Sequence, residues 1–145
     1  MDPAEYRKIL DLNVVSLLEM TQAVLPAMRA QGFGRIVNVS SGATRMVLAG
    51  DGAYVATKSA VNMLSAVFRE ELASDGIAVS LLLPSMTATE FGNSMFQLGT
   101  EPGPGQVVHH PEYVAGAVLR MLRTGEDTFD IPHGPEQPDI ARVQG

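Results

Sequence analysis

The chain has 145 residues, of which 46% are hydrophobic and 18% are charged, a composition typical of one soluble globular domain. Its formal net charge is −6 and it has no basic cluster, which excludes nucleic acid as an expected partner, because such binding needs a cationic surface. The lack of cysteine excludes disulfides and thiolate metal sites. No apolar stretch approaches the roughly 20 residues that span a membrane, and the first residues do not resemble a signal peptide. We therefore expect no membrane partner and, by default, a cytoplasmic location.

Helices and strands are predicted to alternate along the chain. Asp2 and Pro3 are a typical helix start, and an apolar stripe predicts a helix from Pro3 toward Met28. Pro26 is expected to strain its last turn. The elements that follow are a strand over Arg35–Val39, a helix over Ala53–Leu72, a strand over Ile77–Leu83, a weak helical stretch around Glu90–Leu98, a helix from Pro111 to Thr124-Gly125 and a short strand over Phe129–Pro132. The tail from His133 is expected to be irregular. This order predicts an α/β fold with a parallel sheet.

Ser41, Tyr54 and Lys58 form the most informative pattern. Tyr54 and Lys58 are four residues apart in a predicted helix, so their side chains project from one face. A cation beside a phenol favours the phenolate and lowers the tyrosine pKa, which suits a general acid or base. Ser41 ends a predicted strand, where open α/β sheets bind ligands, and could polarise a carbonyl or orient an alcohol. Taken singly, these residues are ordinary, because tyrosine and lysine are common on helices and serine is common at strand ends.

Four segments follow one another in an order and spacing known from one enzyme family. They are Leu10-Asp-Leu-Asn13-Val-Val, Gly34-Arg-Ile-Val-Asn-Val-Ser-Ser41, Tyr54-Val-Ala-Thr-Lys58 and Val79-Ser-Leu-Leu-Leu-Pro84-Ser85-Met86-Thr87-Ala88-Thr89. Together they resemble the short-chain dehydrogenase/reductase family over nearly the whole chain. The resemblance implies hydride transfer between NAD or NADP and a small-molecule ketone or secondary alcohol. It also implies a homodimer or homotetramer.

The resemblance assigns a role to each candidate residue. Tyr54 would be the general acid in reduction and the base in oxidation. Lys58 would lower its pKa and hold the nicotinamide ribose, and Ser41 would hydrogen-bond the substrate oxygen. Asn13 would help to hold a water that relays protons to Lys58; without the family it is a tolerated helix asparagine. The residues expected against the cofactor are Tyr54, Lys58, Pro84, Ser85, Thr87 and Thr89.

The chain also departs from the family pattern. The family's Gly-rich turn between its first strand and helix is missing: Gly32-Phe-Gly34 precedes a strand, and no dinucleotide fingerprint follows Gly50-Asp-Gly52. We therefore expect residues 1–145 to form the C-terminal portion of one domain. Its fold would be a partial Rossmann-like, doubly wound parallel sheet of about three strands with flanking helices, lacking the first half. Ser85 replaces the glycine of the family's proline-glycine pair, which either crowds a bound nicotinamide or is neutral.

Two interpretations of function remain open. One is an NAD(P)-dependent oxidoreductase of the short-chain type. The other is a truncated, non-catalytic module that acts in oligomerisation or binding. The isolated chain is expected to be inactive, because hydride transfer needs a firmly held cofactor. The residue that would distinguish NAD from NADP is expected in the missing half.

The remaining candidates have ordinary interpretations. His109 and His110 are expected to be loop residues rather than metal ligands, so we predict no metal site. Arg45 either meets an acidic substrate or, as is more common, is an exposed, unpaired arginine. The residues that either line an apolar substrate pocket or simply pack are Met46, Met86, Phe91, Met95 and Phe96.

Overall fold

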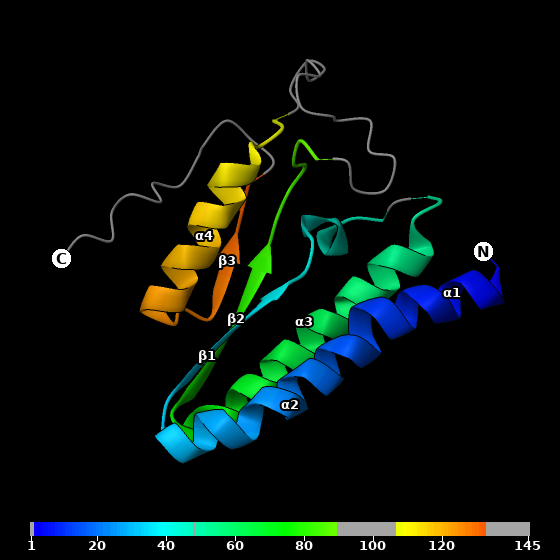
Figure 1. Cartoon of the computed structure of the whole chain (residues 1–145). Coiled ribbons are helices and arrows are strands. Elements are labelled where there is room, and N and C mark those ends of the chain that lie inside the picture. Colours follow the sequence, from blue (N-terminus) through cyan, green and yellow to red (C-terminus); the bar gives the residue numbers. More distant parts are fainter. Residues whose placement is uncertain (1, 48, 90–106, 133–145) are drawn as a thin grey trace.

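In the part of the chain that the structure describes, three parallel strands form a sheet with helices on both of its faces (Figure 1). The computed structural model describes residues 2–47, 49–89 and 107–132. Strand β2 (Ile77–Leu83) lies between β1 (Gly34–Val39) and β3 (Thr128–Asp130). Helices α2 (Ser16–Gln31) and α3 (Gly52–Leu72) cover one face, and α4 (Pro111–Thr124) covers the other. The predicted α/β class with about three parallel strands is confirmed.

The central strand β2 explains why helices cover both faces. Its side chains alternate between the two sides of the sheet, as the pleat requires. Leu82 packs in one apolar cluster with Met121 of α4, whereas Leu81 and Leu83 pack in another with Val61 of α3. Six of its seven residues are buried, as the nearly continuous apolar run predicted.

The N-terminal helix is longer and less regular than expected. It consists of α1 (Pro3–Leu10), a π-helical segment η1 (Asp11–Val15) and α2, so it runs past the predicted end near Met28. The backbone N–H of Ala4 donates to Asp2 Oδ1 at 3.1 Å, which confirms the predicted N-cap. π-Bulges in helices often accompany functional sites, and this one contains Asn13.

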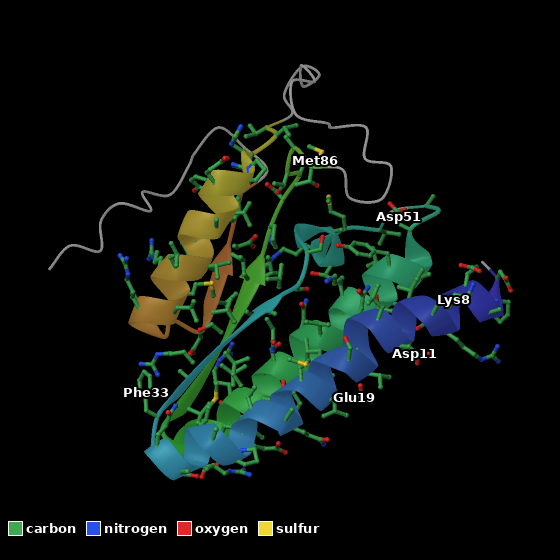
Figure 2. All side chains as sticks on the ribbon, in the orientation of Figure 1. Lys8, Asp11, Glu19, Phe33, Asp51 and Met86 are labelled. Atoms are coloured by element: carbon green, nitrogen blue, oxygen red, sulfur yellow. The ribbon has the colours of Figure 1, made fainter. Side chains whose placement is uncertain are left out.

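The same helix corrects one expectation from composition. Pro3–Gln31 contains an 18-residue window with a mean hydropathy of 1.3, so by length and composition it could cross a membrane. One such helix is a weak indication, because helices of soluble proteins and signal sequences meet the same criterion. The helix also carries charged side chains on its exposed surface, among them Lys8, Asp11 and Glu19 (Figure 2).

The remaining boundaries differ only slightly from the predictions. Helix α3 begins one residue before Ala53, and a short 3₁₀ turn, η2 (Gly42–Arg45), follows β1. Strand β3 is shifted and shorter than Phe129–Pro132. The predicted helical stretch around residue 90 and the tail from His133 lie outside the described residues.

Candidate functional site

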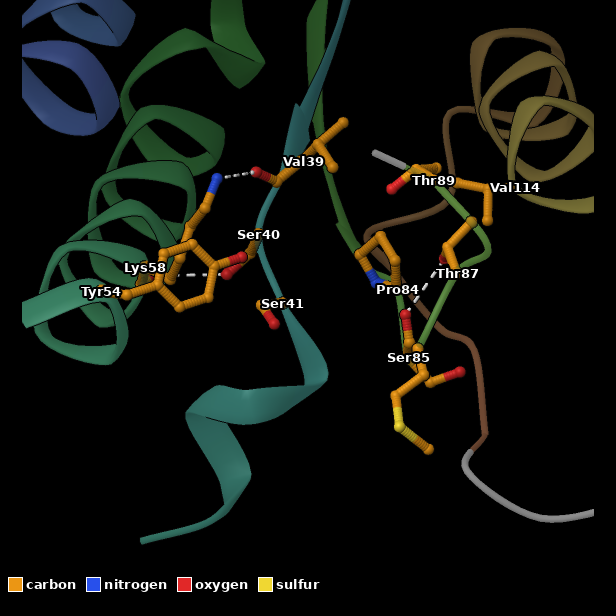
Figure 3. Close-up of a pocket in the computed structure, with 11 residues that line it drawn as sticks. Val39, Ser40, Ser41, Tyr54, Lys58, Pro84, Ser85, Thr87, Thr89 and Val114 are labelled. Carbon is orange, nitrogen blue, oxygen red and sulfur yellow. Dashed lines mark hydrogen bonds between the residues drawn. The ribbon is translucent and has the colours of Figure 1, made fainter. Parts of the chain in front are cut away.

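A cleft of about 440 Å³ opens at the carboxyl ends of β1 and β2 (Figure 3). All the predicted site residues except Asn13 line it. The described residues that line it are Val39, Ser40, Ser41, Tyr54, Lys58, Pro84, Ser85, Met86, Thr87, Thr89 and Val114. The residues come from the end of β1 and the turn after it, from α3, from the segment after β2 and from α4. The cleft therefore lies at the carboxyl end of the sheet, between the helices of its two faces. This is where open parallel sheets bind their ligands.

Tyr54 and Lys58 form the α3 wall of the cleft. The Lys58 Nζ atom lies 5.8 Å from the centroid of the Tyr54 ring. It also donates to the Val39 carbonyl of β1 at 3.0 Å, which anchors the ammonium beside the phenol. Burial lowers the pKa of Lys58 from its usual value, because the half-buried ammonium loses water. An ammonium has three donors, so it can also bind groups that enter the cleft.

Ser41 lies two residues after the end of β1 and lines the cleft together with Tyr54. Its backbone is extended, and its Oγ atom accepts a hydrogen bond from the Ala43 N–H at 3.1 Å. Because the hydroxyl oxygen is already an acceptor there, its proton can be donated to an oxygen in the cleft. Strand pairing continues around it: the Ser40 and Gly42 N–H groups each donate to a β2-side carbonyl at 2.8 Å.

The opposite wall is the segment 84–89. Thr87 Oγ1 donates to the Ser85 carbonyl at 3.1 Å, and Ser85 Oγ donates to the Pro132 carbonyl at 3.3 Å. Thr87 also forms a parallel β-bridge with His109. The hydroxyl of Ser85 therefore joins this wall to the chain after β3.

Asn13 is the predicted site residue that does not reach the cleft lining. Its Nδ2 atom donates to Thr57 Oγ1 at 3.0 Å, and Thr57 Oγ1 donates to the Tyr54 carbonyl at 2.8 Å. Thr57 is fully buried and directly precedes Lys58 in α3. Asn13 thus contacts the helix that carries the tyrosine and the lysine, and the water relay stays a prediction.

The structure corrects the expected environment of Arg45. Its Nε atom lies 2.7 Å from Asp130 Oδ2 at the end of β3, so the interpretation as an unpaired arginine is wrong. The two histidines also differ from one another. His110 is exposed and bonds to Glu112, whereas His109 is only 1% exposed and its Nε2 donates to the Pro132 carbonyl at 3.0 Å. Within residues 2–47, 49–89 and 107–132, no three ligand-type side chains gather as a metal site would require.

Some lining residues were not anticipated from the sequence. Val39 and Ser40 directly precede Ser41, so their position at the strand end was the available signal. Val114 carried no signal, because its place depends on how α4 packs against the sheet. Met86 lines the cleft, Met46 does not, and Phe91, Met95 and Phe96 lie outside the described residues.

Known proteins are similar to this chain in both sequence and fold. A family model described as short chain dehydrogenase matches residues 1–98. A probable NADP-dependent dehydrogenase of Haemophilus influenzae is 34% identical, over 99% of this chain and 55% of its own length. Estradiol 17-beta-dehydrogenase 2 of Rattus norvegicus is 40% identical, over 88% of this chain and 38% of its own length. A short-chain dehydrogenase of Sphingobium yanoikuyae, solved with NADPH, superposes with a TM-score of 0.77 at 27% identity, over 91% of this chain and 50% of that one.

The alignments cover nearly all of this chain but only part of each relative. The chain spans about half the length of the curated relatives it matches. Within that span, the family model covers the N-terminal helix, the strand that ends at Ser41, the helix of Tyr54 and Lys58, and the segment after β2. The chain belongs to the short-chain dehydrogenase family.

Proposed function

We propose that the chain supplies the catalytic half of an NAD(P)-dependent oxidoreductase that interconverts a ketone and a secondary alcohol. The observation that carries the proposal is the meeting of Ser41, Tyr54 and Lys58 in one cleft. A phenol can donate a proton to a carbonyl oxygen, and a hydroxyl donor and an anchored ammonium can stabilise the charges that develop. Family membership gives independent support.

In reduction, the Tyr54 hydroxyl gives its proton to the carbonyl oxygen of the substrate. Ser41 donates a hydrogen bond to the same oxygen and stabilises the charge that develops on it. The Lys58 ammonium stabilises the negative charge left on the phenol oxygen. In oxidation, the proton of the alcohol returns to Tyr54. A bound nicotinamide would supply or accept the hydride.

The cleft suits the nicotinamide end of such a cofactor. The Lys58 ammonium has donors for ribose hydroxyls, and Thr87 and Thr89 bring hydroxyls to the opposite wall. This sequence lacks the Gly-rich turn that would bind the pyrophosphate of the cofactor, so we propose that residues outside it bind the pyrophosphate and the adenosine. The NADPH in the Sphingobium yanoikuyae structure makes NADPH the first cofactor to test.

The substrate is proposed to be a small carbonyl compound or alcohol. Relatives bear names that point to different compounds, among them a ketoacyl reductase of Nostoc and the rat estradiol dehydrogenase. A panel of diacetyl, an acetoacetyl thioester and estrone therefore samples small, thioester-linked and bulky ketones. We also propose a cytoplasmic location and a homodimer or homotetramer.

The product of the complete reading frame is assayed for NADPH and NADH oxidation with this panel. Tyr54→Phe retains the ring and its packing but removes the transferable proton, so the rate is expected to fall by about 10²-fold or more. Tyr6→Phe, on the N-terminal helix away from the cleft, makes the same chemical change and is expected to leave the rate unaltered. A Tyr54→Phe enzyme that keeps more than about a tenth of the rate overturns the proposed function.

A second candidate is a truncated, non-catalytic module. It is favoured by the span of only about half of the relatives and by the missing phosphate-binding turn. The reading frame upstream of Met1 distinguishes the two. About 90 further residues with a Gly-rich strand–helix turn favour the enzyme. An in-frame stop directly before Met1 favours the module.

A further inference from the structure

Asn62 joins helix α3 to the turn that carries Ser41. It lies one helical turn after Lys58 and is half-buried, but it does not line the cleft. Its Nδ2 atom donates to Thr44 Oγ1 at 3.1 Å, and its Oδ1 atom accepts from Ser40 Oγ. One asparagine therefore holds the residue before Ser41 and the residue three positions after it.

The direction of these hydrogen bonds is set by Thr44. Its hydroxyl has one proton, which it donates to the Ser41 carbonyl at 2.8 Å. Its oxygen must then accept from Asn62, which places the NH₂ group of the amide toward Thr44 and leaves Oδ1 for Ser40. The result is a ring that hydrogen bonds and the backbone close together. Asn62 donates to Thr44, Thr44 donates to the Ser41 carbonyl, and the adjoining Ser40 donates to Asn62. Ser40 Oγ also lies 3.2 Å from the carbonyl oxygen of Lys58.

We propose that Asn62 is a positioning residue that holds the Ser41 hydroxyl toward the substrate oxygen. The inference rests on the proposed function, because it assigns Asn62 to the same reaction. Backbone bonds tie Ser40 to Leu82 of β2 and Gly42 to Pro84, which directly follows β2. Asn62 braces the same turn from the α3 side, where Tyr54 and Lys58 are carried. It thereby sets the serine relative to the tyrosine, and small displacements of reacting groups are costly to the rate.

Stability alone does not explain an asparagine here. Asn62 lies in the interior of a 21-residue helix, where its side chain competes for backbone hydrogen bonds and alanine is favoured. Asn62→Ala is therefore expected to leave the helix intact while it releases the turn. This separation makes the proposal testable.

The first measurement is amide hydrogen exchange on the chain itself. The N–H groups of Thr44 and Met46 bond within η2, to the Ser41 and Ala43 carbonyls. Asn62→Ala and Thr44→Val each remove the brace, and both are expected to speed exchange at these two amides by about tenfold, the equivalent of one ordinary hydrogen bond. Ser59→Ala, on the exposed side of the same helix, is the matched control and leaves them unaltered. Thr44→Val also removes the Thr44–Ser41 bond, so the decision rests on Asn62→Ala: unchanged exchange in that variant overturns the proposal.

The second measurement is the rate of the product of the complete reading frame, with NADPH and the best ketone of the panel. Asn62→Ala, and Asn62→Asp, which keeps Oδ1 but lacks the NH₂ donor, are expected to lower kcat about tenfold with little change in the cofactor KM. In a Ser41→Ala background, Asn62→Ala is expected to have no further effect, because the group it positions is gone. An equal fall in both backgrounds overturns the proposal while leaving the Tyr54→Phe test of function untouched. Conversely, the exchange result stands whatever Tyr54→Phe shows.

Discussion

The backbone at Gly76 lies close to the backbone at Gly32. Substituting alanine at each position in turn tests this close approach through the free energy of unfolding. Both glycines are in the left-handed region, with φ of 73° at Gly76 and 67° at Gly32. A Cβ atom on Gly76 would lie 2.5 Å from the Gly32 carbonyl oxygen. A Cβ atom on Gly32 would meet nothing within 4 Å. The two substitutions therefore share the backbone strain and differ in the collision.

The expected costs follow from these two terms. Left-handed strain destabilises an alanine by about 1 kcal/mol or slightly more at either position. At Gly76 the collision is with backbone, which cannot rotate away, and forced displacement of this kind adds about 2 kcal/mol. The contact also lies directly beside the first hydrogen bond between the two strands, in which the Gly34 N–H donates to the Gly76 carbonyl at 3.3 Å. Gly32→Ala is thus expected to cost about 1 kcal/mol and Gly76→Ala about 3 kcal/mol.

Urea unfolding followed by circular dichroism gives both free energies. The difference of about 2 kcal/mol corresponds to about 6 °C in Tm for a chain of this size. Equal costs for Gly32→Ala and Gly76→Ala, within about 0.5 kcal/mol, would show that the turns before β1 and β2 do not touch as described.

Three further predictions concern the chain itself. Isothermal titration with NADH and NADPH is expected to give a Kd above about 10 μM, because the phosphate cradle is missing; tighter binding, beyond roughly −7 kcal/mol, contradicts this. Burial lowers the pKa of Lys58, so the folded state disfavours its charged form. This penalty on folding is complete below the pKa of Lys58 in the folded state and disappears as the pH rises toward 10.5, where the unfolded chain also loses the proton. In urea unfolding, the wild type is therefore expected to gain stability relative to Lys58→Met as the pH is raised. Parallel stability profiles of the two proteins against pH contradict this expectation. Light scattering at low micromolar concentration is expected to show a dimer or a larger oligomer. Among the described residues β1 pairs only with β2, so its other edge is open to a second chain, and a cleft of about 380 Å³ lies beside it. A monomer of 15.4 kDa that melts cooperatively contradicts this expectation.

The meeting of Ser41, Tyr54 and Lys58 in one cleft was predictable because each of them belongs to, or directly follows, a regular element with a local signature. Spacing alone put Tyr54 and Lys58 on one helix face, and the β-rich run placed Ser41 at a strand end. The parallel pairing of β1 with β2 then brings the strand end next to Pro84. At these residues the local sequence pattern and the tertiary structure favour the same arrangement.

Features that depend on distant partners were not predictable. Arg45 finds Asp130 only because β3 lies two strands away in the same sheet. His109 is buried because its backbone pairs with Thr87 and its ring stacks on Tyr113, with centroids 5.0 Å apart. A histidine in a loop next to a proline shows neither contact in its local sequence. The π-helical interruption at Asp11–Val15 likewise lacks a glycine or proline to announce it.

Strand β1 holds the Lys58 ammonium at its carboxyl end and has an open outer edge among the described residues. The carbonyl that holds the Lys58 ammonium belongs to Val39, the last residue of β1, and Val39 is 45% exposed. Within the described part of the chain, the outer edge of β1 has no neighbouring strand. A strand that pairs there would therefore stiffen the anchor of Lys58 as well as cover an open edge. Under the proposed function Ser41, Tyr54 and Lys58 need a fixed geometry, so a strand that pairs with β1 would also affect the reaction rate.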